Sequence, residues 1–191
     1  LAPQLWPSTA TRDALGALTI GGVSAGELAA RFGTPLYVVD ERDARHRASK
    51  TLEAFSAAAE RHGTTATVYY AGKAFLSAEV ARWMTSAGLN IDVASGGELA
   101  VALAAGTDPA RIGLHGNNKS VREIDSAVSA GVGAIVIDSL LEIERVASAA
   151  RTHGRVQAVR LRINSGVHAH THEYLATARE DQKFGIPLAE A

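Results

Sequence analysis

The sequence predicts an α/β fold of the (β/α)₈ TIM-type barrel class, with only about the first five βα units present. Strand-like runs that are fully apolar or rich in β-branched and aromatic residues recur about every 22 residues. Alanine-rich segments whose apolar residues recur at helical spacing separate these runs. Because a βα unit of this length requires parallel strands with right-handed crossovers, the architecture is α/β. The runs begin near Thr67, Leu89, Arg111, Ala134 and Val156.

A complete five-stranded doubly wound sheet is the alternative fold. The even spacing and the lack of a glycine-rich phosphate fingerprint after the first strand favour the barrel. A barrel needs about 250 residues, so we expect this chain of 191 residues to be the front part of a longer protein. The run PLYVVDERDARHRASKTLEAF before the repeat predicts a separate strand and helix. We therefore assign residues 1–45 to an N-terminal arm of a second, β domain and residues 46–191 to a truncated barrel.

Serine–glutamate pairs mark the predicted starts of three helices. The serine hydroxyl accepts from the third helical amide while the glutamate reaches back, so that two otherwise unpaired N–H groups are satisfied. The pairs are Ser95 with Glu98, Ser120 with Glu123, and Ser139 with Glu142.

Composition narrows the class of partner. The chain is 47% hydrophobic and 20% charged, as expected for a globular protein, and 19 Lys+Arg against 20 Asp+Glu give a net charge of −1. Because the chain carries no excess of basic residues, we expect neither nucleic acid nor an anionic membrane as a partner. The expected partner is a small molecule. The absence of cysteine fits a reducing compartment, and no apolar run reaches 18 residues, so we predict a soluble cytoplasmic protein.

Polar residues follow the predicted strands, where α/β folds bind their ligands. These residues are Lys73, Asp92 with Ser95, His115 with Asn117 and Asn118, Asp138, and Arg162 with Asn164. Turn and capping chemistry alone favours Asp and Asn at positions 138 and 118, so a structural role is the preferred interpretation of Asp138 and Asn118. A strand-end lysine can extend to solvent, but Lys73 has small neighbours that would let a planar ring approach. A lysine in such a place suits imine formation, which needs a neutral amine.

Four segments together resemble the N-terminal half of the diaminopimelate decarboxylases, pyridoxal phosphate enzymes of the alanine-racemase-like barrel class. They are YYAGKAF, LNIDVASGGELAVAL, LHGNNKS and HAHTHEYLATAREDQKFG, and the start LWPSTATRD is similar to actinobacterial versions. Decarboxylases of other basic amino acids share the lysine and a DVAS-like strand. The HGNNK and HTHEY…KFG motifs are what point to the diaminopimelate branch.

The resemblance implies pyridoxal 5'-phosphate as the cofactor, meso-2,6-diaminopimelate as the substrate and L-lysine as the product. It implies that Lys73 carries the cofactor as an internal aldimine, that Asp92 lines the pocket beneath it, and that Arg162 lies near its ring oxygen. The family's stacking histidine, phosphate loop, pyridine-nitrogen glutamate and catalytic cysteine are expected beyond Ala191, so the isolated segment is expected to be incomplete for activity. The resemblance also implies a head-to-tail homodimer.

Three other functions remain open at the level of sequence. The chain could act on another basic amino acid of the ornithine or arginine type, or it could be an inactive fragment or binding relative. It could also be a metal-dependent hydrolase, because His168, His170 and His172 alternate and would share one face of a strand. Since only His115 stands at a comparable site on the other strand ends, we expect no metal.

Overall fold

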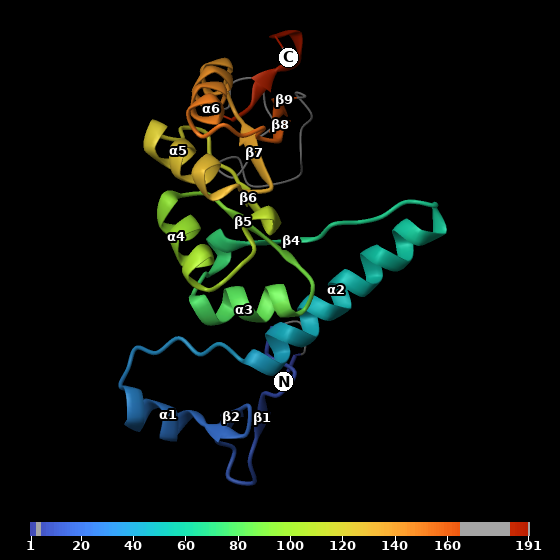
Figure 1. Cartoon of the computed structure of the whole chain (residues 1–191). Coiled ribbons are helices and arrows are strands. Elements are labelled where there is room, and N and C mark those ends of the chain that lie inside the picture. The colour runs from blue at the N-terminus through green and yellow to red at the C-terminus, as the bar shows by residue number, and fades with distance from the viewer. Residues whose placement is uncertain (3–4, 165–183, 191) are drawn as a thin grey trace. The chain divides into compact units, whose positions relative to one another are not determined.

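The computed structural model describes residues 1–2, 5–164 and 184–190, and it divides the chain into two compact units (Figure 1). The first unit contains Leu1–Val68 with Ser86–Leu89, and the second contains Tyr69–Thr85 with Asn90–Ala191. The predicted repeat occupies the second unit. The boundary that we predict between residues 45 and 46 stays a prediction.

The first unit combines a small antiparallel sheet with two helices. Side-chain caps begin both helices, because Ser24 accepts from the backbone N–H of Glu27 and Asp40 accepts from that of Asp43. The strands, in the order β1-β2-β3, are Thr11–Arg12, Leu18–Ile20 and Val23–Ser24, and the helices are α1 (Ala25–Phe32) and α2 (Glu41–Arg61).

The strand that the sequence predicts before α2 does not form. Residues 35–39 lie outside any sheet, and Tyr37 is 98% exposed. A β-strand needs a neighbour that accepts and donates its backbone hydrogen bonds, and no described segment pairs with this one. The run has the composition of a strand without the partner that would make it one.

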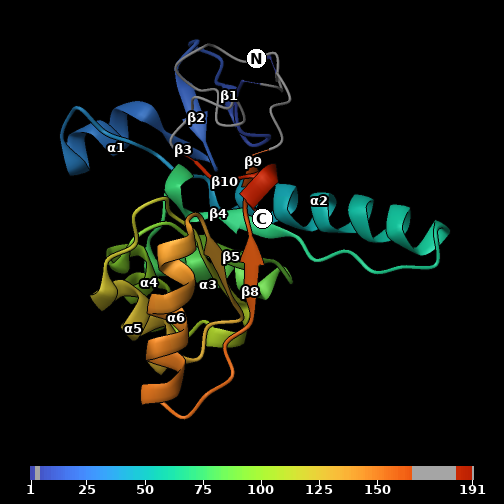
Figure 2. The ribbon, with the colours of Figure 1, turned by 90° about the horizontal axis from the view of Figure 1, so that it is seen from above.

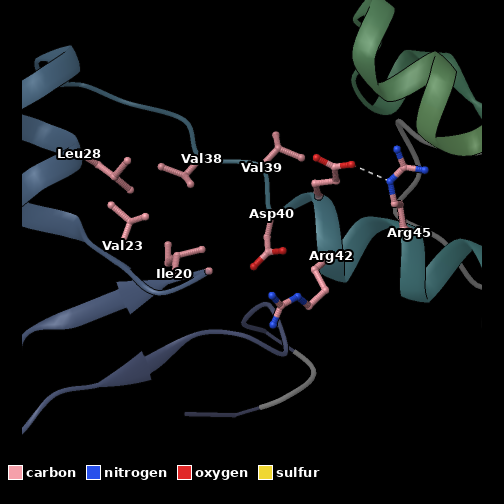
Figure 3. Close-up of a pocket in the computed structure, with 10 residues that line it drawn as sticks. Ile20, Val23, Leu28, Val38, Val39, Asp40, Arg42 and Arg45 are labelled. Carbon is pink, nitrogen blue, oxygen red and sulfur yellow. Dashed lines mark hydrogen bonds and ion pairs between the residues drawn. The ribbon is translucent and has the colours of Figure 1, made fainter.

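The first unit also contains a cavity of about 530 Å³ (Figure 3). Aliphatic side chains from β2, β3, α1 and the segment before α2 line one part of it, and the first turns of α2 line the rest. Glu41 and Arg45 form an ion pair of 2.7 Å at this edge. The lining includes no lysine, histidine or cysteine and none of the site residues predicted from the sequence. This cavity is therefore distinct from the predicted site.

The second unit is built on a parallel sheet in the order β4-β5-β6-β7-β8. Spatial order equals chain order, which confirms the predicted βα repeat. The strands are Tyr69–Ala71, Asn90–Val93, Ile112–Leu114, Ala134–Ile137 and Val159–Leu161. Beyond β8 the chain continues as β9 (Ile163–Asn164), which pairs in parallel with β10 (Ile186–Pro187).

Helices cover one face of this sheet. Each right-handed crossover leads to the next strand in the same direction, so all the helices come to lie on the same side, as Figure 2 shows for α4, α5 and α6. The strand residues of that side, among them Ile91, Ile112 and Ile135, are fully buried. The helices are α3 (Ala78–Ser86), α4 (Gly96–Ala104), α5 (Val121–Ala130) and α6 (Leu140–Thr152), and short 3₁₀ turns are η1 (Gly72–Ala74), η2 (Pro109–Arg111) and η4 (Leu188–Glu190).

The sheet is curved, because side chains from its two edges touch. Arg160 of β8 donates from Nη2 to the hydroxyl of Tyr69 in β4 at 3.1 Å, and its guanidinium lies 5.1 Å from the centre of that ring. In a flat sheet, strands four positions apart would be separated by about 19 Å. The uncovered face is therefore concave. Sequential strand order, helices on one face and concave curvature together confirm a partial barrel wall and exclude the doubly wound alternative.

Two of the three predicted helix caps form. Ser120 and Glu123 make both halves of a capping box. The Glu123 carboxylate also accepts from the backbone N–H of Gly96 at 2.8 Å, and the N–H groups of Ser120 and then Gly96 hold the pKa of Glu123 below its usual value. Ser95 caps α4 by accepting from the backbone N–H of Glu98. The Glu98 carboxylate in turn accepts from the backbone N–H of Ala94, the residue before Ser95, rather than from that of Ser95.

The prediction for Ser139 is wrong. Its hydroxyl makes no capping hydrogen bond, although Ser139 does precede α6. The carboxylate of Glu142 instead accepts from the backbone N–H of Asp138 at 2.9 Å and from Lys119 Nζ at 2.7 Å. A buried ammonium is a stronger partner for a carboxylate than a neutral amide, so Glu142 turns toward Lys119.

Candidate active site

Lys73 lies in the η1 turn that directly follows β4, as the sequence predicts for a strand-end lysine. The Tyr70 hydroxyl donates to the carbonyl oxygen of Phe75 at 2.7 Å and so closes this turn. Burial raises the pKa of Tyr70, which keeps its hydroxyl protonated as a donor. Lys73 is exposed and makes no hydrogen bond or ion pair with any residue that the structure describes. Its amine is therefore available to a ligand.

The glycine before Lys73 serves the packing of the sheet. Gly72 is buried, and a Cβ at this position would lie 2.8 Å from the carbonyl oxygen of Asp92. Only glycine fits there without moving the backbone of β5. Gly72 is one of the small neighbours of Lys73 that the sequence suggests would admit a planar ring, whereas the structure gives a reason for this glycine that needs no ligand.

Asp92 lies on the concave face, beside the strand that leads to Lys73. It pairs in register with Ala71 and, on its other side, with Gly113. A Cβ on Gly113 would lie 2.8 Å from Asp92 Oδ1, so this glycine provides the space for the carboxylate. His115 Nε2 approaches Oδ1 to 3.1 Å. That contact has an ion-pair distance but not hydrogen-bond geometry, and Oδ1 is buried without a hydrogen bond in the described part of the chain.

Arg162 lies between β8 and β9 and belongs to the same concave face. Arg160, two residues earlier in the same segment, points to that face through its contact with Tyr69. Strand residues two apart share a side of the sheet, so Arg162 faces the same way. The Arg162 guanidinium lies 4.4 Å from the centre of the Phe184 ring, and Nη1 lies 3.8 Å from Asp138 Oδ1. Asp138 Oδ2 accepts from the backbone N–H of Gly185 at 3.1 Å. The sequence explained Asp138 by turn chemistry, but its contacts are with distant parts of the chain.

The sequence argument missed a buried ion pair behind these strand ends. Lys119 Nζ donates to Glu142 Oε2 at 2.7 Å and to the carbonyl oxygens of Gly116 and Val136 at 2.6 Å each. Both charged side chains are 2% exposed. The one available signal was a lysine between a buried strand and a helix-capping serine. The pair fixes the loop that carries His115.

The structure thus brings the predicted residues to one end of the sheet in separate groups. Lys73 lies in the turn after β4, Asp92 contacts His115, and Arg162 contacts Asp138. The other predicted residues have different surroundings. Ser95 caps a helix, Asn117 is half-buried and Asn118 is exposed in the same loop, and Asn164 is buried in a strand.

No group of three or more histidine, cysteine, aspartate or glutamate residues that could hold a metal occurs in the described part of the chain. His168, His170 and His172, on which the metal hypothesis depends, lie outside the described residues. None of the described helices is both long and apolar enough to cross a membrane.

Comparison with known families identifies the family of this chain. Residues 48–191 match the family described as pyridoxal-dependent decarboxylase, pyridoxal binding domain. The chain belongs to this family. The match covers the whole repeat, including all the strands of the parallel sheet, and it confirms the class of cofactor that the sequence resemblance implied.

Within the pyridoxal-dependent decarboxylases, the chain is similar to diaminopimelate decarboxylases. It is 53% identical over 189 residues to the diaminopimelate decarboxylase of Mycobacterium tuberculosis, with 99% of this chain and 41% of that protein covered. A crystal structure of diaminopimelate decarboxylase from M. jannaschii in co-complex with L-lysine matches with a TM-score of 0.82 and 32% identity, over 96% of this chain and 42% of that one. A lysine/ornithine decarboxylase from Vibrio vulnificus complexed with cadaverine matches less well, with a TM-score of 0.56 and 25% identity over 72% of this chain and 37% of that one.

These comparisons confirm the fold class and the family resemblance predicted from the sequence. The chain spans about two fifths of the length of the curated relatives it matches. The roles of Lys73, Asp92 and Arg162 stay predictions, because no comparison addresses single residues.

Proposed function

We propose that this chain is the cofactor-binding part of a diaminopimelate decarboxylase, which converts meso-2,6-diaminopimelate to L-lysine and carbon dioxide. The observation that carries the proposal is the exposed amine of Lys73 in the turn after the first strand of a concave parallel sheet, inside the segment that matches the family. The higher identity and TM-scores of the diaminopimelate branch favour it over an ornithine- or arginine-type substrate.

The residues present fit pyridoxal phosphate. The Lys73 amine supplies the nucleophile that an aldehyde requires. Asp92 Oδ1, buried on the concave face without a hydrogen bond in the described structure, offers a charge to a cationic ring or amine. The Arg162 guanidinium offers donors to an anionic ring oxygen. When bound, the cofactor accepts the electron pair that remains on carbon when carbon dioxide leaves.

The protein's own groups would bind and orient the reacting molecule. Lys73 would hold the cofactor covalently through Nζ, and this requires that Nζ first lose its proton. Asp92, with His115 beside its carboxylate, would place a negative charge beneath the bound ring. Arg162 would fix the ring from the opposite edge of the sheet, so that the bond to be broken keeps one orientation.

We extend the proposal to the organisation of the whole protein. Residues 1–45 would contribute to a second, β domain, and residues 46–191 would form the partial barrel. The exposed run of large apolar and aromatic residues at 36–39 supports an additional packing partner for the arm. The protein would act in the cytoplasm as a homodimer. Light scattering of the purified protein measures the dimer directly, and a monomeric mass would contradict it.

The experiment that tests the function uses the protein expressed from its complete gene. It measures carbon dioxide and lysine release from meso-diaminopimelate, with ornithine and arginine as competing substrates. Turnover should require added pyridoxal phosphate and should be lost in Lys73→Ala. The control is Lys50→Ala, which removes an exposed lysine of α2 in the other unit and should leave turnover unchanged. Preference for ornithine or arginine would favour the second candidate, and an active Lys73→Ala variant would contradict both.

A further inference from the structure

We propose that Asp138 is a positioning residue that holds the Arg162 guanidinium at the carboxyl end of the sheet and ties the segment at Phe184 and Gly185 to it. The inference rests on the proposed function, because the role of Arg162 toward the cofactor belongs to that proposal. Asp138 itself would act only through Arg162.

Buried groups behind the strand fix the position of Asp138. Its side chain is 1% exposed, and its backbone N–H donates to Glu142 Oε2 at 2.9 Å. The charge of Glu142 is already matched by Lys119, which lies 2.7 Å away and is equally buried. The charge of Asp138 therefore needs a different cation, since an unpaired carboxylate at this depth is strongly unfavourable.

Arg162 is that cation. Its Nη1 lies 3.8 Å from Asp138 Oδ1, which has no hydrogen bond in the described part of the chain. The other oxygen, Oδ2, is used by the backbone N–H of Gly185 at 3.1 Å. One carboxylate thus joins the end of β7 to two separate chain segments.

The segment at Phe184 and Gly185 closes around Arg162 from another side. The Phe184 ring lies 4.4 Å from the guanidinium carbon, within the range of a cation–π contact. The backbone N–H of Ile186 donates to the carbonyl oxygen of Arg162 at 2.8 Å. Gly185 has a φ of +83°, and a Cβ there would lie 2.9 Å from the same carbonyl oxygen. The close backbone contact between Gly185 and Arg162 therefore places the Phe184 ring near the guanidinium that Asp138 also contacts.

This arrangement fixes the plane of the guanidinium. A guanidinium has five N–H donors in a rigid fork. Asp138 and Phe184 restrain its direction, and N–H groups that do not face the carboxylate are left for a ligand. A purely structural role for Asp138 predicts loss of stability alone. The positioning role predicts that ligand affinity changes, and that the change disappears once Arg162 is gone.

The test is a double-mutant cycle on the holoenzyme expressed from its complete gene. Asp138→Asn keeps an oxygen for the Gly185 N–H and removes the charge, and Arg162→Gln removes the guanidinium. The dissociation constant of pyridoxal phosphate is measured by absorbance titration of the apoprotein. We expect Asp138→Asn to raise this dissociation constant about tenfold, the low end of the loss seen when a partner that orients a metal-binding side chain is removed. In the Arg162→Gln background the same change should add less than about twofold.

The control is Asp125→Asn, which removes the same charge from a carboxylate that lies 2.8 Å from His153 between α5 and α6. It should leave the dissociation constant unchanged. If Asp138→Asn fails to fold in thermal unfolding, Phe184→Leu replaces it in the cycle, because it loosens the same guanidinium and keeps the carboxylate. An unchanged dissociation constant or additive effects would overturn the inference alone. A wild-type protein that does not bind pyridoxal phosphate would overturn the proposed function and this inference with it.

Discussion

Replacement of Lys119 by methionine should destabilise the protein severely. Lys119 and Glu142 are both 2% exposed and lie 2.7 Å apart. Lys119→Met keeps the length of the side chain but leaves the Glu142 carboxylate buried without its cation. Breaking a buried pair in this way costs about 3–5 kcal/mol.

The double variant Lys119→Met/Glu142→Leu removes both charges, but four backbone groups lose their partners. They are the carbonyl oxygens of Gly116 and Val136 and the N–H groups of Lys119 and Asp138. At about 1 kcal/mol for each unpaired group, the double variant should lose about 4 kcal/mol. That is close to one single variant and far from the roughly 8 kcal/mol that two independent losses would give.

Urea unfolding followed by circular dichroism measures these differences, with midpoints compared at a common slope. The control pair is Glu41 and Arg45 of α2, also 2.7 Å apart but 53% and 41% exposed. Breaking it with Arg45→Met should cost less than about 1 kcal/mol. The reasoning fails if Lys119→Met costs no more than this control, or if the double variant loses the sum of the two single losses.

Two further predictions concern acid stability and the space around the site. Because backbone N–H groups, chiefly that of Ser120, lower the pKa of Glu123, its carboxylate stabilises the fold above its unfolded pKa, and this contribution is lost as the pH falls through the lower folded pKa. Glu123→Gln should therefore melt at a lower temperature than the wild type at pH 7, with the gap closing below about pH 4; a gap that stays constant with pH would count against this. Gly113→Ala should displace Asp92 and weaken cofactor binding, because the new Cβ would lie 2.8 Å from Oδ1, whereas Gly97→Ala, whose Cβ meets only ordinary contacts, should not. Equal cofactor affinity in the two alanine variants would contradict the placement of Asp92.

The periodic part of the fold could be read from the sequence because each βα unit repeats the same local signals. The serine–glutamate pairs at the helix starts show what local sequence cannot predict. Ser120–Glu123 and Ser139–Glu142 have the same spacing, yet only the first forms a capping box. The difference comes from Lys119, 23 residues before Glu142, whose buried ammonium takes the carboxylate. The local sequence pattern around a helix start does not indicate a competing partner from another βα repeat.

In the candidate site, too, the positions of residues could be predicted from the sequence but their contacts could not. The rule that ligands bind at the carboxyl ends of parallel strands placed Lys73, Asp92 and Arg162 at one end, and the register of the strands agrees. The individual contacts at this end were not predicted, among them that of His115 with Asp92 and that of Phe184 with Arg162. These contacts depend on sheet curvature and on the return of a distant segment, neither of which is set by local sequence.

Reductive trapping at Lys73 tests the central claim most directly. The protein is treated with pyridoxal phosphate and borohydride, digested, and mapped by mass spectrometry. We predict that the peptide containing Lys73 carries the reduced cofactor, because its amine is exposed at the carboxyl end of the parallel sheet. Lys119, whose side chain is buried and paired with Glu142, should stay unmodified. Stoichiometric labelling at Lys119 or at any other lysine, with Lys73 unmodified, would contradict the account.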